Sequence, residues 1–370
     1  VGAEWVEMWR AAAVTVSDQP VADDAWASGC DWPVTFEVPT AADWPSGFYV
    51  VELRPDDGPG DDVGRAWFTL GGPASRERPL LVLSTNTWNA YNQWGGRCLY
   101  SGAHAVSFRR PLERGYLHRD ADDDGFDGRV TSVVPDDPEH RRLQHYQARR
   151  EYPLWSASSG WFNWERRFVA WAEHEGLELD YAIDADLHHD EQLLDGRTLL
   201  LTVGHSEYWS WEMRDHVDAF VEAGGNWAIF SGNTCFWQVR LEGDTMVCHK
   251  GSARGRDPVR RGGELDRLTS MWSDPLIGRP EADTIGLSFT RGGYHRIGRA
   301  VPRGAGAYTV HDPDHWALEG TGLAAGDQLG AGSYVVGYEV DGCAMTLEHG
   351  RPIPSGEDDT PPSMQILSLI

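Results

Sequence analysis

The segment GHSEY at 204–208 places a histidine and a carboxylate directly after a strongly apolar run. In α/β-hydrolases such a strand-to-helix corner carries a nucleophilic serine within the pattern GxSxG. Here Glu207 stands where a small residue is expected, which argues against Ser206 as a nucleophile. His205 and Glu207, two residues apart, suit metal binding or acid–base chemistry better. The structural alternative is that the histidine caps a helix whose N-terminal dipole attracts the glutamate.

A second polar segment, STNTWNAYNQWGGRCLY at 84–100, follows another apolar run and holds two tyrosines. Tyr91 precedes the glycine pair Gly95-Gly96, and Tyr100 follows it. Serine, threonine and asparagine beside a buried strand end need hydrogen-bond partners, which favours a functional site. The alternative is a hairpin rich in Trp and Tyr that packs on the domain.

A third strand end reads SGNTCFWQVR at 231–240. Asn233 stands where a side-chain amide could donate to a developing oxyanion. Cys235 would be a nucleophile if a histidine and an activating turn lay beside it, as on a glutamine-amidotransferase-like sheet. The alternative for Cys235 is a small buried hydrophobic residue.

An acidic segment, DADDDGFDG at 120–128, spaces its carboxylates like the first half of a calcium loop. Asp120, Asp122 and Asp124 match that pattern, but Thr131 stands where the loop's bidentate glutamate is expected. A solvated acidic loop is the alternative interpretation.

The elements around these segments predict how the strand ends meet. Continuous apolar runs are typical of strands buried on both faces, as in parallel sheets. The predicted strands lie at 79–85, 178–184, 197–205 and 226–234, and amphipathic helices ending in glycine are predicted at 163–177 and 209–225. This order predicts a mostly parallel sheet flanked by helices, glutamine-amidotransferase-like, with ligands beyond the carboxyl ends of its strands.

The chain before this sheet is richer in short alternating runs. The runs at 32–40, 46–55 and 64–70 are bounded by Pro, Gly and Asp and predict strands. They predict a small immunoglobulin-like β-sandwich domain over 1–72, followed by an α/β catalytic domain with a C-terminal extension over 73–370.

Composition excludes several classes of function. The net charge is -25 and Lys250 is the single lysine, so the sequence lacks the basic footprint of a nucleic-acid or anionic-membrane binder. No apolar run reaches the roughly 20 residues of a membrane span, and no signal peptide is visible. The five cysteines are odd in number and form no CxxC pair, which indicates reduced thiols in a cytoplasmic protein.

The segments STNTWNAYNQWGG, GHSEYWS and SGNTCFWQVR together resemble the C-terminal region of the large subunit of N,N-dimethylformamidase and a family of shorter proteins that share this region. The resemblance implies a mononuclear iron, Fe3+, held by two tyrosines and one glutamate. The matching residues are Tyr91, Tyr100 and Glu207.

The same resemblance implies roles for residues around the metal. His205 matches a histidine beside the iron, and Asn233 matches an asparagine near the substrate. The family uses a later glutamate in the pocket, for which Glu348 is the nearest candidate.

We therefore expect an iron-dependent hydrolase of a C–N bond in a small amide, such as an N-substituted formamide. Two other classes stay open: a metal-free thiol hydrolase that uses Cys235, and a non-catalytic carbohydrate-binding protein suggested by the 18 tryptophans. The sequence also leaves open a homo-oligomer and the need for a small second subunit.

Overall fold

The computed structural model describes residues 5–11, 13–56, 63–128, 138–294, 307–331, 335 and 339–370. At its centre lies a four-stranded sheet in the order β5-β3-β6-β8, in which every neighbouring pair is parallel. Its strands are β3 (Leu80–Leu83), β5 (Asp180–Ile183), β6 (Leu199–His205) and β8 (Asn226–Gly232). All four strands predicted from apolar runs therefore form, and their carboxyl ends share one edge of the sheet.

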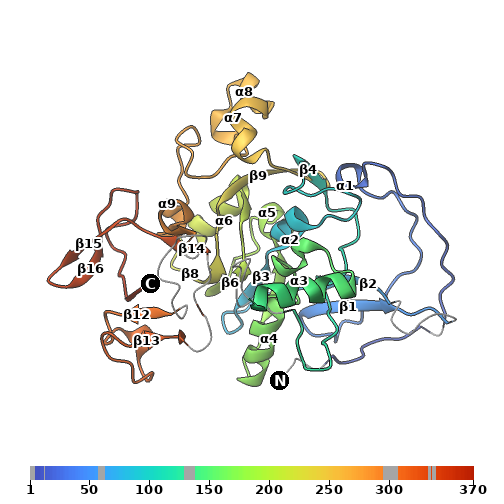
Figure 1. Ribbon diagram of the computed structural model, residues 1–370, viewed down its shortest axis with the longest axis horizontal. Coiled ribbons are helices and arrows are strands. Elements are labelled where there is room, and N and C mark those ends of the chain that lie inside the picture. The colour runs from blue at the N-terminus through green and yellow to red at the C-terminus, as the bar shows by residue number, and fades with distance from the viewer. Residues whose placement is uncertain are drawn as a thin grey trace.

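Helices cover both faces of this sheet. They are α2 (Thr85–Tyr91), α4 (Glu165–His174), α5 (Asp184–His189) and α6 (Trp211–Glu222), while α3 (Pro138–Arg150) lies further out (Figure 1). Successive strand residues point to opposite faces, so β3 supplies Leu81 to one core cluster and Leu80 to the other. The first cluster includes Val169 of α4, and the second includes Met213 of α6.

A second sheet of four strands adjoins the carboxyl end of β6. Its order is β4-β10-β9-β7, in which β7 pairs parallel with β9. The strands are β4 (Ala105–Ser107), β7 (Tyr208–Ser210), β9 (Trp237–Glu242) and β10 (Thr245–Val247). The chain thus leaves one sheet after His205 and enters the next at Tyr208, and the corner between them holds Glu207.

The described residues of the first 72 contain α1 (Ala25–Ser28) and one antiparallel pair, β1 (Gly47–Leu53) with β2 (Gly64–Leu70). Two of the three predicted strands form here. The strand predicted at 32–40 is wrong: this segment is irregular, and Pro33 and Pro39 remove two backbone donors from it. The immunoglobulin-like sandwich, the boundary at 72 and the glutamine-amidotransferase-like relationship stay predictions.

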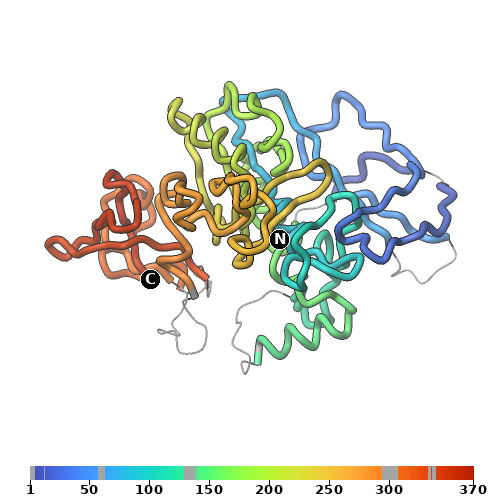
Figure 2. The backbone as a smooth tube through the Cα atoms, turned by 90° about the horizontal axis from the view of Figure 1, so that it is seen from above, coloured from blue at the N-terminus to red at the C-terminus, as the bar shows by residue number. Residues whose placement is uncertain are grey.

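The C-terminal part of the chain is built from short elements. They are α7 (Ala253–Arg256), α8 (Val259–Gly262), α9 (Ala282–Ile285), α10 (Phe289–Gly292), β11 (Gly293–Tyr294), β12 (Tyr308–Val310), β13 (Gln328–Leu329), β14 (Glu339–Gly342), β15 (Met345–Glu348), β16 (Arg351–Pro354) and β17 (Ser368–Leu369). Figure 2 shows the C-terminal segments at one end of the molecule and the N-terminal segments at the other, with the central sheet between them. Within the described residues, no helix is long and apolar enough to cross a bilayer.

A buried carboxylate ties this C-terminal part to β9. Asp257 Oδ2 accepts from Arg240 Nη1 at 2.9 Å and from the backbone N–H and hydroxyl of Thr269 at 2.9 and 2.7 Å. Burial alone would raise the pKa of Asp257, but the bonds from Arg240 and Thr269 outweigh it and lower that pKa to about 2.

We expect Asp257→Asn to lower the free energy of unfolding at neutral pH by about 1–3 kcal/mol, because it weakens several charge-assisted bonds at once. The folded-state pKa lies below the unfolded one, so this stabilisation is present above the unfolded value of 3.8 and is lost as pH falls toward about 2. Denaturant unfolding at several pH values would measure it, with the exposed Asp266→Asn as control. The prediction would be contradicted if the free energies of unfolding of Asp257→Asn and the parent protein differed as much in acid as at neutral pH.

Candidate functional site

The corner after β6 is held in place by its backbone. The Ser206 carbonyl accepts from the N–H of Cys235 at 2.9 Å, and the Glu207 carbonyl accepts from the N–H of Trp237 at 2.8 Å. Ser206 Oγ accepts from Trp209 Nε1 at 3.0 Å. Ser206 is therefore a buried structural residue, as the replacement of the GxSxG pattern indicates.

Two tyrosines from a distant part of the chain meet the Glu207 carboxylate. The Tyr91 hydroxyl donates to Glu207 Oε2 at 3.0 Å, and the Tyr100 hydroxyl lies 2.9 Å from both carboxylate oxygens. Tyr91 is the last residue of α2, and its ring stacks on that of Tyr100 at a centroid distance of 4.2 Å. Two tyrosines and a glutamate more than 100 positions later in the sequence thus bring their oxygens together.

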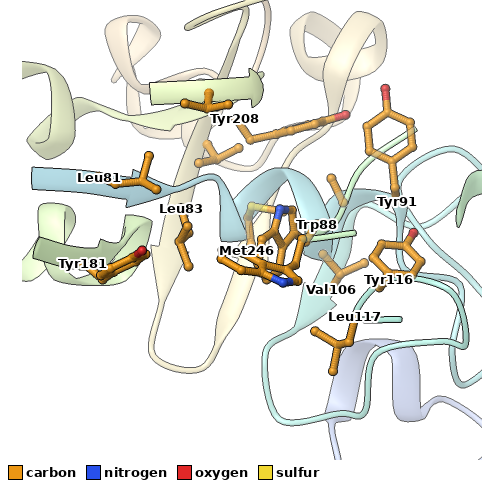
Figure 3. Packing of buried hydrophobic residues seen from close by; sticks show 14 of the residues in the cluster. Leu81, Leu83, Trp88, Tyr91, Val106, Tyr116, Leu117, Tyr181, Tyr208 and Met246 are labelled. Atoms are coloured by element: carbon orange, nitrogen blue, oxygen red, sulfur yellow. The ribbon is translucent and has the colours of Figure 1, made fainter. Parts of the chain in front are cut away.

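Two further groups close this cluster. The Tyr208 hydroxyl donates to the Tyr100 hydroxyl at 2.9 Å, and Trp237 Nε1 donates to Glu207 Oε1 at 2.8 Å. Figure 3 shows β3 leading into α2 and the hydroxyl end of Tyr208 directed toward Tyr91. The oxygens therefore lie in a buried, aromatic-lined part of the core.

Burial sets the protonation of this cluster. It raises the pKa of Tyr91 and that of Tyr100 well above their usual value, and the charge of Glu207 raises both further. Burial would also raise the pKa of Glu207, but the hydrogen bond and charge of His205 outweigh it and lower that pKa. Without a cation, the cluster is thus one ionised carboxylate and two neutral phenols.

His205 has both ring nitrogens engaged. Nδ1 lies 2.9 Å from the carbonyl of Ser158, and because a carbonyl only accepts, Nδ1 carries the proton. Nε2 then faces Glu207 Oε2 at 3.3 Å and Asn233 Nδ2 at 3.3 Å. Burial lowers the pKa of His205, but the hydrogen bond and charge of Glu207, the Ser158 carbonyl and the charge of Glu339 together outweigh burial and raise this pKa.

Asn233 connects these contacts to Glu339, a carboxylate outside the set of predicted site residues. Its Nδ2 donates to Glu339 Oε2 at 3.0 Å. Asn233 has φ 53°, a left-handed conformation that asparagine tolerates better than most residues. Its Oδ1 is buried and has no hydrogen-bond partner within the described part of the chain, so it can accept from a bound molecule.

Comparison with known proteins bears on this geometry. The profile of the family described as "N,N-dimethylformamidase beta subunit-like, C-terminal" matches residues 2–369. The chain belongs to this family. An N,N-dimethylformamidase beta subunit from an Alcaligenes species is 25% identical over 231 residues, which cover 57% of this chain and 28% of that relative. The chain thus matches less than a third of the relative's length.

The relative and the family carry the name beta subunit, whereas the sequence analysis assigned the resemblance to a large subunit. The structure brings five of the six predicted site residues of this dimethylformamidase-like chain together: Tyr91, Tyr100, His205, Glu207 and Asn233.

Glu348 is the sixth predicted residue, and the structure does not bring it to this cluster. It is exposed at the end of β15, which pairs with β16 at the edge of the molecule (Figure 1). Glu339, at the start of β14, reaches Asn233 instead. The only signal for Glu339 in the sequence is its place directly after a short apolar run. Glu207 likewise follows an apolar run.

Lys250 is a second residue that sequence reasoning noted but did not place. Its Nζ lies 3.2 Å from the centroid of the Tyr100 ring and 5.6 Å from that of Trp237. This cation is one of the charges that lower the pKa of Glu207. The single lysine of the chain thus faces the tyrosine–glutamate cluster.

The acidic segment at 120–128 lies elsewhere, against α3. Asp124 Oδ2 pairs with Arg142 at 2.5 Å, and Asp122 pairs with Arg149 and Arg150. Arginines therefore neutralise two of the carboxylates predicted for a calcium loop. Thr131 lies outside the described residues. Among the residues that the structure describes, no group of three or more His, Cys, Asp or Glu side chains could hold a metal ion.

Cys235 lies in a different environment from the cluster. It is fully buried beside Trp209 and Met213 in the second core cluster, and burial raises the pKa of its thiol to about 12. A thiol with so high a pKa supplies almost no thiolate at neutral pH, which argues against its use as a nucleophile.

We expect Cys235→Ala to turn over an amide substrate at the same rate as the parent protein, and to lower the free energy of unfolding by about 1 kcal/mol, because it removes only buried volume. Steady-state kinetics and denaturant unfolding would measure the two effects. An inactive variant that still unfolds like the parent protein would restore the thiol-hydrolase alternative.

Proposed function

We propose that this protein is an iron-dependent hydrolase of the C–N bond of a small linear amide, with an N-substituted formamide as the expected substrate class. The observation that carries the proposal is the meeting of three side chains: the hydroxyls of Tyr91 and Tyr100 each lie 2.9–3.0 Å from a carboxylate oxygen of Glu207. Membership in the dimethylformamidase-like family supports the same chemistry.

The chemistry of these donors fits a highly charged cation. Phenolate and carboxylate oxygens are hard, anionic ligands that favour ferric iron over softer ions. A cation would also compensate the cost of ionising Tyr91 and Tyr100, whose pKa values burial raises in its absence. We therefore assign these two tyrosines and Glu207 as the ligands of the iron.

Iron held there would act as a Lewis acid on the amide carbonyl and would acidify a water molecule. In the hydrolysis, a C–O bond forms between water and the amide carbon, the C–N bond breaks, and the departing nitrogen takes up a proton. His205 Nε2 is the group that carries this proton, since its Nδ1–H is fixed on the Ser158 carbonyl.

Asn233 and the aromatic side chains orient the substrate. The free Oδ1 of Asn233, whose Nδ2 is held by Glu339, can accept a hydrogen bond from the attacking water. Trp155 lies 5.2 Å from Tyr100 and 5.9 Å from Tyr91 between ring centroids. Such aromatic walls exclude bulk water and favour small apolar N-substituents.

Metal analysis of the protein as purified, combined with an assay for amine release from N,N-dimethylformamide, tests this proposal. We expect about one iron per chain, a visible absorption band from the phenolate–iron pair, and loss of both band and activity on iron removal. A colourless, iron-free protein with full amidase activity would overturn it.

The carbohydrate-binding alternative receives less support from the packing. Trp88, Trp161 and Trp209 are buried in the two cores rather than arranged on an exposed platform. Glycan binding without turnover of any amide would reinstate this alternative.

A further inference from the structure

Helix α2 contacts the site at more than its last residue. Besides ending in Tyr91, it places Thr87 Oγ1 2.9 Å from the backbone N–H of Glu207. It also places Asn86 Nδ2 3.1 Å from the carbonyl of Tyr208. The helix therefore contacts the backbone of the corner at the Glu207 N–H and at the Tyr208 carbonyl, through side chains that the chemistry itself does not use.

These contacts are buried, so each one matters for the geometry. Thr87 and Glu207 are both almost completely shielded from solvent, and the Thr87 hydroxyl is the acceptor that satisfies the Glu207 N–H. A buried backbone N–H that loses its acceptor is costly, and the peptide moves to find another. The Glu207 N–H shares its peptide with the Ser206 carbonyl, which accepts from the N–H of Cys235, so Thr87 and Cys235 together fix the rotation of this peptide.

The helix itself is anchored to a third element. Asp184 Oδ2, at the start of α5, accepts from the backbone N–H of Asn86 at 2.8 Å. Asn86 is fully buried between this carboxylate and Tyr208. Hydrogen bonds thus connect α5 to α2 and α2 to the corner at Glu207. These bonds between elements fix the spacing between Tyr91 and Glu207.

We propose that Thr87 is a positioning residue that sets the placement of the Glu207 carboxylate relative to Tyr91, and with it the affinity of the metal site, an inference that rests on the proposed function. Hydrogen-bonding partners behind metal ligands commonly change metal affinity by about 10- to 100-fold when they are removed. The Asn86–Tyr208 contact supports the same corner from its other side.

Thr87→Val tests this proposal, because it keeps the shape of the side chain and removes the acceptor. Thr87→Ser keeps the hydroxyl and serves as the rescue variant, while Thr85→Val makes the same change at another buried threonine of α2. The measurements are iron affinity by competition with a chelator, the visible absorption band, amide hydrogen exchange of a peptide that contains Glu207, and thermal unfolding of the iron-free protein.

We expect Thr87→Val to weaken iron binding about 10- to 100-fold, to shift the band and to speed exchange at Glu207. Thr87→Ser and Thr85→Val should retain the parent affinity and band. If the parent protein binds iron and Thr87→Val binds it equally well, the positioning role is overturned while the proposed function stands. If Thr85→Val weakens binding as much as Thr87→Val, the effect belongs to helix stability and the positioning role is likewise overturned. A parent protein that binds no iron overturns both.

Discussion

Tyr91→Phe is expected to remove or shift the visible absorption band of the iron form, since Tyr100 remains as a phenolate, and to lower kcat/KM by roughly 10³-fold. The substitution removes one hydroxyl from the point where Tyr91, Tyr100 and Glu207 meet, and it leaves the buried ring in place. A Lewis acid contributes several kcal/mol to an amide hydrolysis, so the loss of a ligand that holds it costs about this factor. Absorption spectra, metal content and steady-state kinetics on the same preparation would measure the effect.

Tyr146→Phe is the matched control for this experiment. Tyr146 is equally buried, but its hydroxyl donates to the carbonyl of Asp120 at 2.8 Å, away from the cluster. We expect this variant to keep the band and the activity. A fully active Tyr91→Phe protein with the absorption band of the parent would remove Tyr91 from the metal site.

His205→Gln is expected to lower kcat by about 10²–10⁴-fold while iron and its absorption band remain. Glutamine can still form hydrogen bonds near Glu207, but it cannot carry a proton as the His205 imidazole does. Loss of activity with the metal retained would therefore show that His205 acts in proton transfer and not in metal binding. Tyr91→Phe cannot make this distinction, because it changes the metal site itself. Single-turnover kinetics together with metal content would distinguish the two effects.

His216→Gln provides the comparison for His205. His216 lies on α6, and its Nδ1 lies 2.8 Å from the Leu187 carbonyl, as the Nδ1 of His205 lies against the Ser158 carbonyl. This variant should remain active. If His205→Gln also retains the parent kcat, another group must move the proton and the assignment of His205 is wrong.

The sequence predicted the position of the corner well because local signals converge there. The apolar run of β6 and the polar residues directly after it identify His205 and Glu207 without any long-range information. Tyr91 and Tyr100 came from resemblance to a family, since nothing local indicates that they contact a residue more than 100 positions later.

Other features could not be predicted for physical reasons. The segment Thr85–Tyr91 consists mainly of Thr, Asn and aromatic residues, which have weak intrinsic helix propensity, so a hairpin was the local alternative. It forms a helix because the side chains of Asn86 and Thr87 bind the backbone of Tyr208 and Glu207, and the Asn86 N–H donates to Asp184. Glu339 was missed because β14 has only four residues and its contact with Asn233 spans 106 positions.

The position of Lys250 has a practical consequence for covalent labelling. It carries the single ε-amino group of the chain, and this group lies against the ring of Tyr100 rather than in solvent. Reagents that attach to lysine side chains, whether fluorophores, cross-linkers or immobilisation resins, have one such target, and it sits beside the tyrosine–glutamate cluster. The rate at which an amine-selective probe modifies this lysine therefore reports how often the cluster opens to solvent, without any engineered tag.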